Sequence, residues 1–383
     1  ASPCKNGAQG RLFTSPQGQV LFSWTTFIND STDALQFAPL EKDQWGEART
    51  IAEGTDWFVN WADFPALATF PENDDQLLAH WLEMRAEGTY DYDVHLTIST
   101  DDGQNWGSSF IPHRDSIAAE HGFVSMVPLE KERIFVSWLD GRNTKGEGHD
   151  HGGHDHGQGA GAMTIRAAEV AADGSLHGEA ALDERVCDCC QTSAALTDEG
   201  PVVVYRDRSA EEVRDIAIVR RVAGSWTEPQ AVHADGWKIA GCPVNGPVVK
   251  ASGKMVAVAW YAAPKDTGEV KVAFSYDSGA TFEAPIRVDH GKPLGRVGLE
   301  IMNDESVVVL WMEQEKEKAS IRAREILADG TSGDEILITQ TEASRQSGFP
   351  VMCKDDDSLY FAWTVVGEVS SEVQTARLLL NKK

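Results

Sequence analysis

The sequence is short of positive charge. It contains 34 Lys and Arg residues against 60 Asp and Glu, which gives a formal net charge of −26. A chain this acidic repels phosphate backbones and anionic lipid headgroups. Nucleic acids and anionic membrane surfaces are therefore excluded as expected partners.

Long apolar runs and helical hydrophobic periodicity are missing as well. The longest apolar runs are about five to seven residues, whereas a transmembrane helix needs about 20. No membrane-spanning segment is expected. Hydrophobic residues still make up 42% of the chain, with 12 Trp and 14 Phe, which is enough for a packed globular core.

The sequence begins at Ala1 without the charged and then apolar segments of a secretory signal, so such a signal is either absent or was trimmed before Ala1. We take the signal peptide to have been removed and expect a periplasmic or extracellular protein.

A short apolar strand that ends in an aromatic residue recurs seven times. The aromatic residues are Trp24, Trp81, Trp138, Tyr205, Trp260, Trp311 and Trp363. An alternating strand and a polar turn follow most of them. Small antiparallel sheets repeated at about 50 residues are typical of a β-propeller. We predict an all-β chain, one propeller domain over residues 1–383, with seven four-stranded blades; six blades are the alternative.

The repeat makes further structural predictions. The recurring aromatic residues are expected to pack between blades rather than to bind a ligand. The longest interval contains a Gly/His-rich insertion, residues 146–161, which is assigned to blade 3. Only three residues follow the last apolar run, so we expect the N-terminal segment to supply the outer strand of blade 7.

Two turns share the pattern S-x-D-x-G-x-x-(W/F). They are Ser99–Trp106 and Ser275–Phe282. In such a turn the Asp accepts amide hydrogens, the Gly supplies an unusual dihedral, and the aromatic residue packs between strands. This pattern resembles the Asp-box, or BNR repeat, of the sialidase-like propeller superfamily. The resemblance implies that the functional face is the one opposite these turns.

In a propeller, the loops after each repeated aromatic residue and before each inner strand share one face. The residues placed there are Trp57–Asp63, Glu83–Tyr92, His113–His121, Asp140–Arg142, Cys187–Thr192, Arg206–Arg208, Ile239–Asn245, Tyr261, Arg296 and Arg345–Pro350. The aromatic segment at residues 57–63 has three possible roles: stacking on a sugar, enclosing a metal pocket, or capping blade packing.

Six cysteines fit either disulfides or a metal site. The expected metal ligands are Cys187, Cys189, Cys190 and Cys242, with His149, His151, His154 and His156 as an auxiliary arm. Thiolates favour Cu(I) or Zn²⁺, and imidazoles suit borderline metals, so we predict copper or zinc. The alternative is disulfide bonding of Cys242 to Cys189 or Cys190, with a bond between Cys4 and Cys353 tying the two ends of the ring.

The resemblance to sialidases implies an arginine cluster, a Tyr–Glu nucleophile and an Asp acid/base. The chain lacks the usual R-I-P arginine motif and has Arg11-Leu12-Phe13 at its first inner strand. Candidates for catalytic roles are Asp63, Arg142, Tyr205, Arg206, Arg208, Tyr261 and Arg345. Tyr90, Tyr92 and Arg296 also map to this face. Ion pairing and core packing are the competing interpretation of all these residues.

Three functions are consistent with these sequence features. The first is an exported propeller whose functional face binds copper or zinc. The second is an exo-acting glycoside hydrolase of the sialidase type, with a carbohydrate ligand. The third is a metal-free scaffold for a protein partner.

Overall fold

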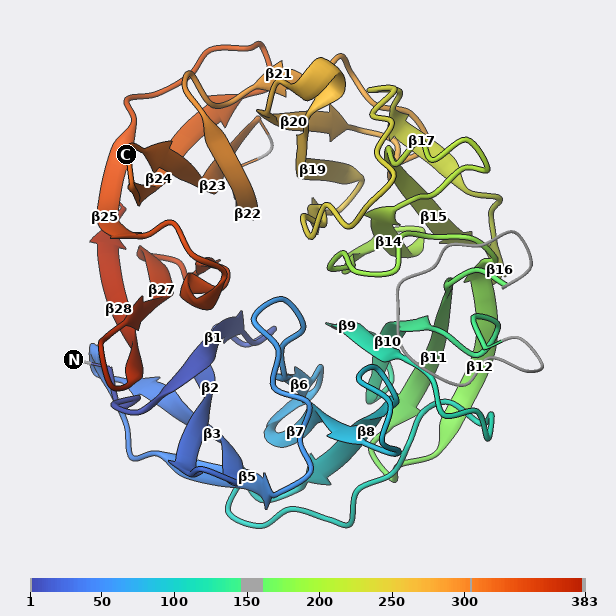
Figure 1. The fold of residues 1–383 in the computed structure, drawn as a ribbon, viewed down its shortest axis with the longest axis vertical. Coiled ribbons are helices and arrows are strands. Elements are labelled where there is room, and N and C mark those ends of the chain that lie inside the picture. Colours follow the sequence, from blue (N-terminus) through green and yellow to red (C-terminus); the bar gives the residue numbers. More distant parts are fainter. Residues whose placement is uncertain (1, 146–160, 304, 381–383) are drawn as a thin grey trace.

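Seven antiparallel sheets surround a central axis in the computed structural model, which describes residues 2–145, 161–303 and 305–380 (Figure 1). The prediction of an all-β propeller with seven blades is confirmed. The repeated aromatic residues all lie on the second strand of their blades, and each is at most 7% exposed. They pack between blades, as expected.

The first four blades follow chain order. Blade 1 contains β1 (Gly7–Thr14), β2 (Val20–Asn29), β3 (Thr32–Glu41), β4 (Gln44–Trp45) and β5 (Arg49–Gly54). Blade 2 contains β6 (Ala66–Phe70), β7 (Asn73–Met84) and β8 (Tyr92–Ser99). Blade 3 contains β9 (His121–Pro128), β10 (Arg133–Asp140), β11 (Thr164–Ala171) and β12 (Leu176–Asp183). Blade 4 contains β13 (Ser193–Thr197), β14 (Gly200–Arg206), β15 (Ile216–Val222), β16 (Ser225–Trp226) and β17 (Gln230–His233).

The remaining blades complete the ring. Blade 5 contains β18 (Val248–Ser252), β19 (Met255–Ala262), β20 (Glu269–Ser275) and β21 (Ile286–Arg287), with the 3₁₀ turn η1 (Pro264–Asp266). Blade 6 contains β22 (Pro293–Asn303), β23 (Ser306–Glu315), β24 (Lys318–Leu327) and β25 (Ile336–Glu342). The 3₁₀ turn η2 (Arg345–Ser347) leads to blade 7, which contains β26 (Val351–Lys354), β27 (Ser358–Val366) and β28 (Ser371–Leu379).

The prediction for the outer strand of blade 7 is wrong. Blade 7 has three strands in the described part of the chain, and the N-terminal segment instead leads directly into β1, the inner strand of blade 1. Side chains join the two blades: the Trp45 indole donates to Thr375 Oγ1 at 3.0 Å, and Arg377 pairs with Asp43. In Figure 1 the first (blue) and last (red) blades accordingly lie side by side.

The two S-x-D-x-G turns have the hydrogen bonds that their sequences predict. Asp101 Oδ1 accepts from the amide of Asn105 at 2.9 Å, and Asp277 Oδ1 accepts from the amide of Thr281 at the same distance. Gly103 follows with a φ of 72°, a conformation that favours glycine. Both turns follow the third strand of a blade, so they lie on the face opposite the predicted functional loops.

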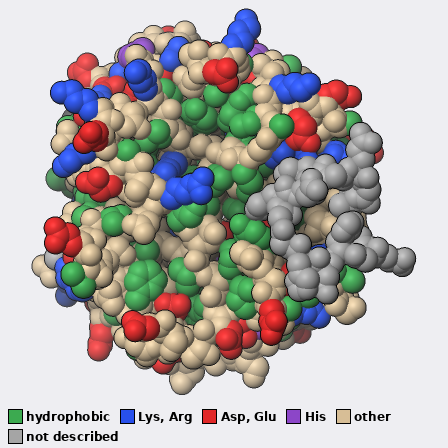
Figure 2. All heavy atoms as spheres, in the orientation of Figure 1, with side chains coloured by type: hydrophobic (Ala, Val, Ile, Leu, Met, Phe, Trp, Pro, Cys, Tyr) green, Lys and Arg blue, Asp and Glu red, His purple; other side chains and the backbone are tan. Residues whose placement is uncertain are grey.

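Acidic side chains are spread around the rim of the face in Figure 2, and hydrophobic ones gather nearer its centre. No helix in the described ranges is long and apolar enough to cross a membrane.

Candidate functional site

Three polar side chains from the loop before β6, the start of β8 and the loop before β9 meet near the central channel of the ring. Tyr92, at the start of β8, has its hydroxyl 3.0 Å from Asp63 Oδ2 and 3.0 Å from Glu120 Oε1. A phenol has one hydrogen and donates to one acceptor at a time. The second carboxyl group must therefore donate to the phenol oxygen, so this carboxyl–tyrosine group holds a proton on one of its two acids.

Burial explains why a proton is held there. It raises the pKa of Asp63 to about 7, although the Phe123 amide at 2.8 Å and the Tyr92 hydroxyl partly oppose the shift. It also raises the pKa of Glu120 to about 8. Asp63 is 1% exposed and Glu120 is partly exposed. Both acids can hold or release a proton near neutral pH, which is the property of a general acid or base.

The backbone around Gly122 and Phe123 is shaped to fit this group. Phe123 has a φ of 52°, at a bulge in β9, and a Cβ on Gly122 would lie 2.1 Å from Asp63 Oδ2. The glycine therefore permits the close approach of the Asp63 carboxylate to β9.

The cysteines divide into one disulfide and two neighbouring thiols. Cys189 and Cys242 are joined, with their Cα atoms 6.1 Å apart, which is the pairing foreseen in the disulfide alternative. Cys187 and Cys190 remain free, and their Sγ atoms lie 3.2 Å apart. With Cys189 and Cys242 oxidised, the predicted four-thiolate locus is reduced to two thiols.

The proposed bond between Cys4 and Cys353 is wrong. Both residues are free and buried, in separate hydrophobic clusters at the junction of blades 7 and 1. Packing, rather than a covalent bond, closes the ring there.

Cys187 lies in an electropositive pocket. Arg214 Nη1 is 3.2 Å from its sulfur. Burial raises the pKa of the Cys187 thiol, but the hydrogen bond from Cys190 and the charge of Arg214 outweigh burial and lower the pKa to about 7. The pKa of Cys190 is raised by burial and by its neighbour. The Cys187 thiol can therefore ionise near neutral pH, and a thiolate is the form of cysteine that can act as a nucleophile or bind a metal.

The two predicted arginines at the end of β14 and just after it, in blade 4, have partners within the protein. Arg206 donates to the carbonyl oxygens of Asn245, Tyr261 and Arg214. Arg208 pairs with Asp188 at 3.1 Å and with Glu212 at 2.8 Å. These contacts brace adjacent loops.

The other catalytic candidates are also engaged. Arg142 binds Asp140 through Nε and Nη2, both at 2.7 Å, and the guanidinium of Arg345 lies 5.8 Å from the Trp61 ring centroid. The Tyr205 hydroxyl donates to Asp183 at 2.7 Å. Tyr261 packs edge-on against Trp237.

Five acidic and imidazole side chains form a separate buried group beside Arg142, which we call the His–Asp cluster: Asp93, His113, Asp115, His121 and Asp140. The two imidazole rings are stacked with centroids 3.8 Å apart. The sequence places His113–His121 and Asp140 on the functional face but does not identify this cluster. The signal that could have found it is the pair of histidines flanking Asp115 in a loop.

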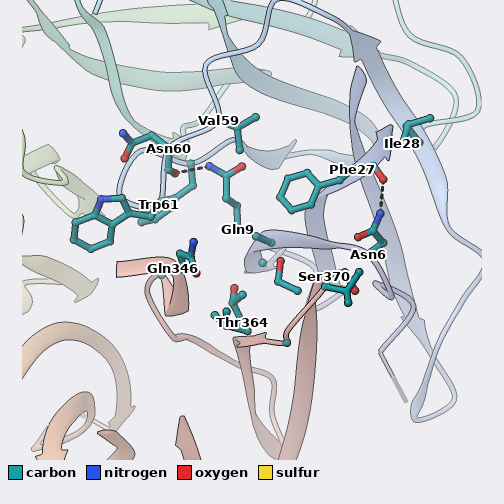
Figure 3. A pocket seen from close by; sticks show the side chains of 18 of the residues that line it. Asn6, Gln9, Phe27, Ile28, Val59, Asn60, Trp61, Gln346, Thr364 and Ser370 are labelled. Atoms are coloured by element: carbon teal, nitrogen blue, oxygen red, sulfur yellow. Dashed lines mark hydrogen bonds between the residues drawn. The ribbon is translucent and has the colours of Figure 1, made fainter. Parts of the chain in front are cut away.

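A cavity of about 590 Å³ opens where blades 7 and 1 meet the loop before β6 (Figure 3). Gln9 donates to the Asn60 carbonyl at 2.6 Å across its wall, and Trp61 and Phe27 supply aromatic surface. A second cavity of about 240 Å³ occupies the channel and includes Asp63 in its lining.

The aromatic segment before β6 has two roles. Trp57 stacks on Trp81, and Phe58 stacks on Tyr92 with centroids 4.0 Å apart, so both contribute to blade packing. Trp61 instead stacks on Phe349 and lines the larger cavity.

The histidines of the predicted auxiliary arm, at positions 149, 151, 154 and 156, lie outside the described residues.

Comparisons with known proteins give structural neighbours. No family model and no curated protein matches the chain. An ulvan lyase from a polysaccharide lyase family aligns with a TM-score of 0.59 at 9% identity, over 97% of this chain and 93% of that one. A structure of the lyase bound to a GlcA(1-4)Rha3S unit gives 0.60 at 10% identity, with the same coverage. A Hadza microbial sialidase gives 0.50 at 14% identity, over 90% of this chain and 73% of that one. These likenesses show a shared fold.

Proposed function

We propose that the protein is an exported β-propeller that binds a copper or zinc ion on the face opposite the S-x-D-x-G turns, with copper as Cu(I) preferred. The observation that carries this proposal is the pair of unpaired, buried thiols of Cys187 and Cys190 beside Arg214. Both cysteines are at most 2% exposed, and their sulfur atoms are 3.2 Å apart. Soft thiolates favour Cu(I) and Zn²⁺.

Charge balance favours Cu(I) at this pair. Two thiolates and one Cu(I) form a unit with a net charge of −1, a smaller charge to bury than that of two bare thiolates, and the guanidinium of Arg214, shared with Glu212 at 2.8 Å, lies 3.2 Å from the Cys187 sulfur. Structural Zn²⁺ sites require four ligands. Thiols at Cys189 and Cys242 would become available only after their disulfide is reduced. A four-thiolate Zn²⁺ site at this locus therefore depends on reduction, whereas two-coordinate Cu(I) binding does not.

The histidines at positions 149, 151, 154 and 156 complete the proposal as an auxiliary arm. Ordering a glycine-rich segment costs conformational entropy, so the arm should bind more weakly than the thiols. It should also release metal as its imidazoles become protonated near pH 6. Its role is to deliver or load metal rather than to hold it.

Competition for Cu(I) with a chromophoric chelator tests the proposal. We expect one tightly bound Cu(I) per chain in protein whose Cys189–Cys242 bond is verified as intact by mass spectrometry. Cys187→Ser and Cys190→Ser should each abolish tight binding. The matched control is Cys353→Ser, which removes a buried free thiol in blade 7. Tight binding that survives the loss of both Cys187 and Cys190 would exclude the thiol pair.

The carboxyl–tyrosine group supports a second candidate function, acid–base chemistry on a carbohydrate. The observation that favours it is the Tyr92 hydroxyl, which lies within hydrogen-bond distance of both Asp63 and Glu120. Asp63 also lines the channel cavity. The fold neighbours named as a polysaccharide lyase and a sialidase agree with a carbohydrate substrate. Glu120, the more accessible acid, would act as the proton donor, and Asp63 and Tyr92 would hold its orientation and charge.

Activity on a panel of sialosides and acidic polysaccharides tests the second candidate, with release of reducing ends as the readout. Because general acid–base catalysis contributes about 10²–10⁴-fold, Glu120→Gln should lower the rate by that order. Asp355→Asn is the control, since it likewise replaces a carboxylate that is bound to a tyrosine hydroxyl, that of Tyr360. Equal rates for the wild-type protein and Glu120→Gln would rule out this role.

A further inference from the structure

Four cysteine sulfurs lie in a row between the loop before β13 and the loop before β18. Cys190 Sγ is 3.2 Å from Cys187 Sγ, and Cys187 Sγ is 3.9 Å from Cys189 Sγ. Cys189 is bonded in turn to Cys242. A buried pair of thiols, Cys187 and Cys190, therefore lies directly beside a disulfide.

Burial decreases along this row of sulfurs. Cys187 is 1% exposed and Cys190 is 2% exposed, whereas Cys189 is partly exposed and Cys242 is exposed. A thiol or disulfide in solution can therefore reach Cys242 but not the buried pair. The Cys189–Cys242 bond is the route by which electrons can pass between that pair and the solvent.

The contact between Cys187 and the disulfide has the features that thiol–disulfide exchange needs. Exchange begins when a thiolate attacks one sulfur of a disulfide and expels the other. Cys189 Sγ is the disulfide sulfur beside Cys187, and Arg214 Nη1, 3.2 Å from Cys187 Sγ, favours negative charge on the attacking atom. The sulfur expelled is that of Cys242, on an exposed loop where water can solvate it.

The spacing of the buried pair suits a disulfide of its own. The segment Cys187-Asp188-Cys189-Cys190 places the two thiols in a C-x-x-C arrangement, which is found in disulfide oxidoreductases. Their sulfur atoms are already in contact, so a bond between them requires little movement of the loop. The four cysteines thus have two end states, one with the Cys189–Cys242 bond and one with a Cys187–Cys190 bond.

We propose that these four cysteines form a thiol–disulfide relay between the solvent and the buried pair. In the first step the Cys187 thiolate bonds to Cys189, the Cys189–Cys242 bond breaks, and Cys242 leaves as a thiolate. In the second step the Cys190 sulfur bonds to Cys187 and Cys189 leaves as a thiolate. The proton that Cys190 loses passes to one of the two released sulfurs. One disulfide and two reduced sulfurs are present before and after, so the exchange needs no oxidant.

A disulfide in solution completes the relay. The released Cys242 thiolate attacks it, which forms a mixed disulfide and releases one external thiol. Cys189 then attacks the Cys242 sulfur, restores the Cys189–Cys242 bond and releases the second external thiol. In sum, the buried pair loses two electrons and one external disulfide becomes two thiols. The relay goes beyond the metal-binding proposal, because it requires no metal and determines whether the buried thiols are present at all.

Labelling of the metal-free native protein with a charged maleimide, in the absence of air, tests the internal exchange. We expect label on Cys242 and a new Cys187–Cys190 bond, both located by mass spectrometry. At high maleimide concentration the labelling rate should no longer depend on that concentration, because the internal exchange then limits it. Cys187→Ser should abolish labelling of Cys242. Cys190→Ser should stop the exchange after its first step, with Cys242 labelled and Cys187 bonded to Cys189.

Cys4 and Cys353 are internal controls, since both are free and buried at the junction of blades 7 and 1. They should stay unlabelled while Cys242 reacts. Labelling of both at the rate of Cys242 would show that exchange occurs only in unfolded chains. Label on the buried pair with the disulfide intact would show direct access to that pair. Either result, or no label on Cys242, overturns the relay and leaves the copper proposal standing.

Oxidised glutathione tests the connection to the solvent. The wild-type protein should lose both buried thiols to a Cys187–Cys190 bond. The variant that carries Cys189→Ser and Cys242→Ser should keep them reduced, because its buried pair has no route to the solvent. Cys353→Ser is the matched control and should behave like the wild-type protein. Equal oxidation rates in the wild-type protein and the double variant would show that external disulfides reach the pair directly, and the proposal would be wrong.

Discussion

At the scale of the residue, burial dominates the chemistry of this face. Asp63, Glu120 and Cys187 are all buried or partly buried, yet their pKa values converge on the neutral range from opposite directions. Desolvation raises the pKa of the two acids, while a hydrogen bond and the charge of Arg214 lower that of the thiol. These groups are therefore poised to exchange protons or bind cations near pH 7.

The raised pKa of Asp63 predicts how the stability of the protein changes with pH. Its pKa rises from about 3.9 in the unfolded chain to about 7 in the folded one, so the folded state binds more protons between these values. Stability then falls as pH rises through this window, by at most about 1.4 kcal/mol per pH unit, and the loss is complete above about pH 7. Asp63→Asn removes this dependence.

Urea unfolding of the wild-type protein and Asp63→Asn across the same pH window measures the effect. The variant should gain stability relative to the wild-type protein as pH rises from about 4 to 7. A constant difference between the two proteins over that window would show that Asp63 ionises normally.

At the scale of the element, the disulfide holds the loop before β13 against the loop before β18. The bond between Cys189 and Cys242 closes a segment with a sequence separation of 53 residues and so links the approaches to blades 4 and 5. Gln191 adds to the same junction, because its Oε1 accepts from the Gly246 amide at 3.0 Å. The position of Cys190, next to the disulfide, depends on this fixed loop.

Removing the disulfide should lower the free energy of unfolding by about 2–5 kcal/mol, as expected for a crosslink of this length. Cys189→Ser with Cys242→Ser should show this loss in urea unfolding while retaining Cu(I), although more weakly, because the two thiols proposed to bind the metal remain. Unfolding of Cys4→Ser, measured alongside, controls for the effect of a cysteine substitution without loss of a crosslink. If the double variant bound no Cu(I) although it was folded, the disulfide sulfurs would belong to the metal site.

At the scale of the whole molecule, periodicity makes the ring predictable but not its centre. Aromatic residues such as Trp138 and Trp260 recur on the same strand of each blade, and that spacing determines both the blade number and the face on which loops converge. The same logic brings Cys189 and Cys242 together, although they are 53 residues apart in sequence. The contacts that the converging loops then make depend on where each side chain points. Neither strand alternation nor the blade repeat encodes that direction.

Several residues illustrate this limit. Arg206 looks available for an anion in the sequence, yet backbone carbonyl oxygens satisfy its guanidinium in the folded ring. Glu120 carries no motif, and only the fold brings it against Tyr92 and Asp63. Counting strands in the sequence predicts that the N-terminal segment supplies the outer strand of blade 7. It cannot foresee that side chains join blades 7 and 1 instead, as the hydrogen bond from Trp45 to Thr375 does.

The copper proposal requires that Cys187 and Cys190 bind Cu(I) while Cys189 and Cys242 stay disulfide-bonded. X-ray absorption at the copper edge, on Cu(I)-loaded protein lacking residues 148–157, measures the ligand set itself. We expect two sulfur ligands and no nitrogen or oxygen ligand, with the disulfide intact by mass spectrometry of the same sample. Copper bound by nitrogen and oxygen alone, or by three or more sulfurs with the disulfide reduced, would contradict the proposal.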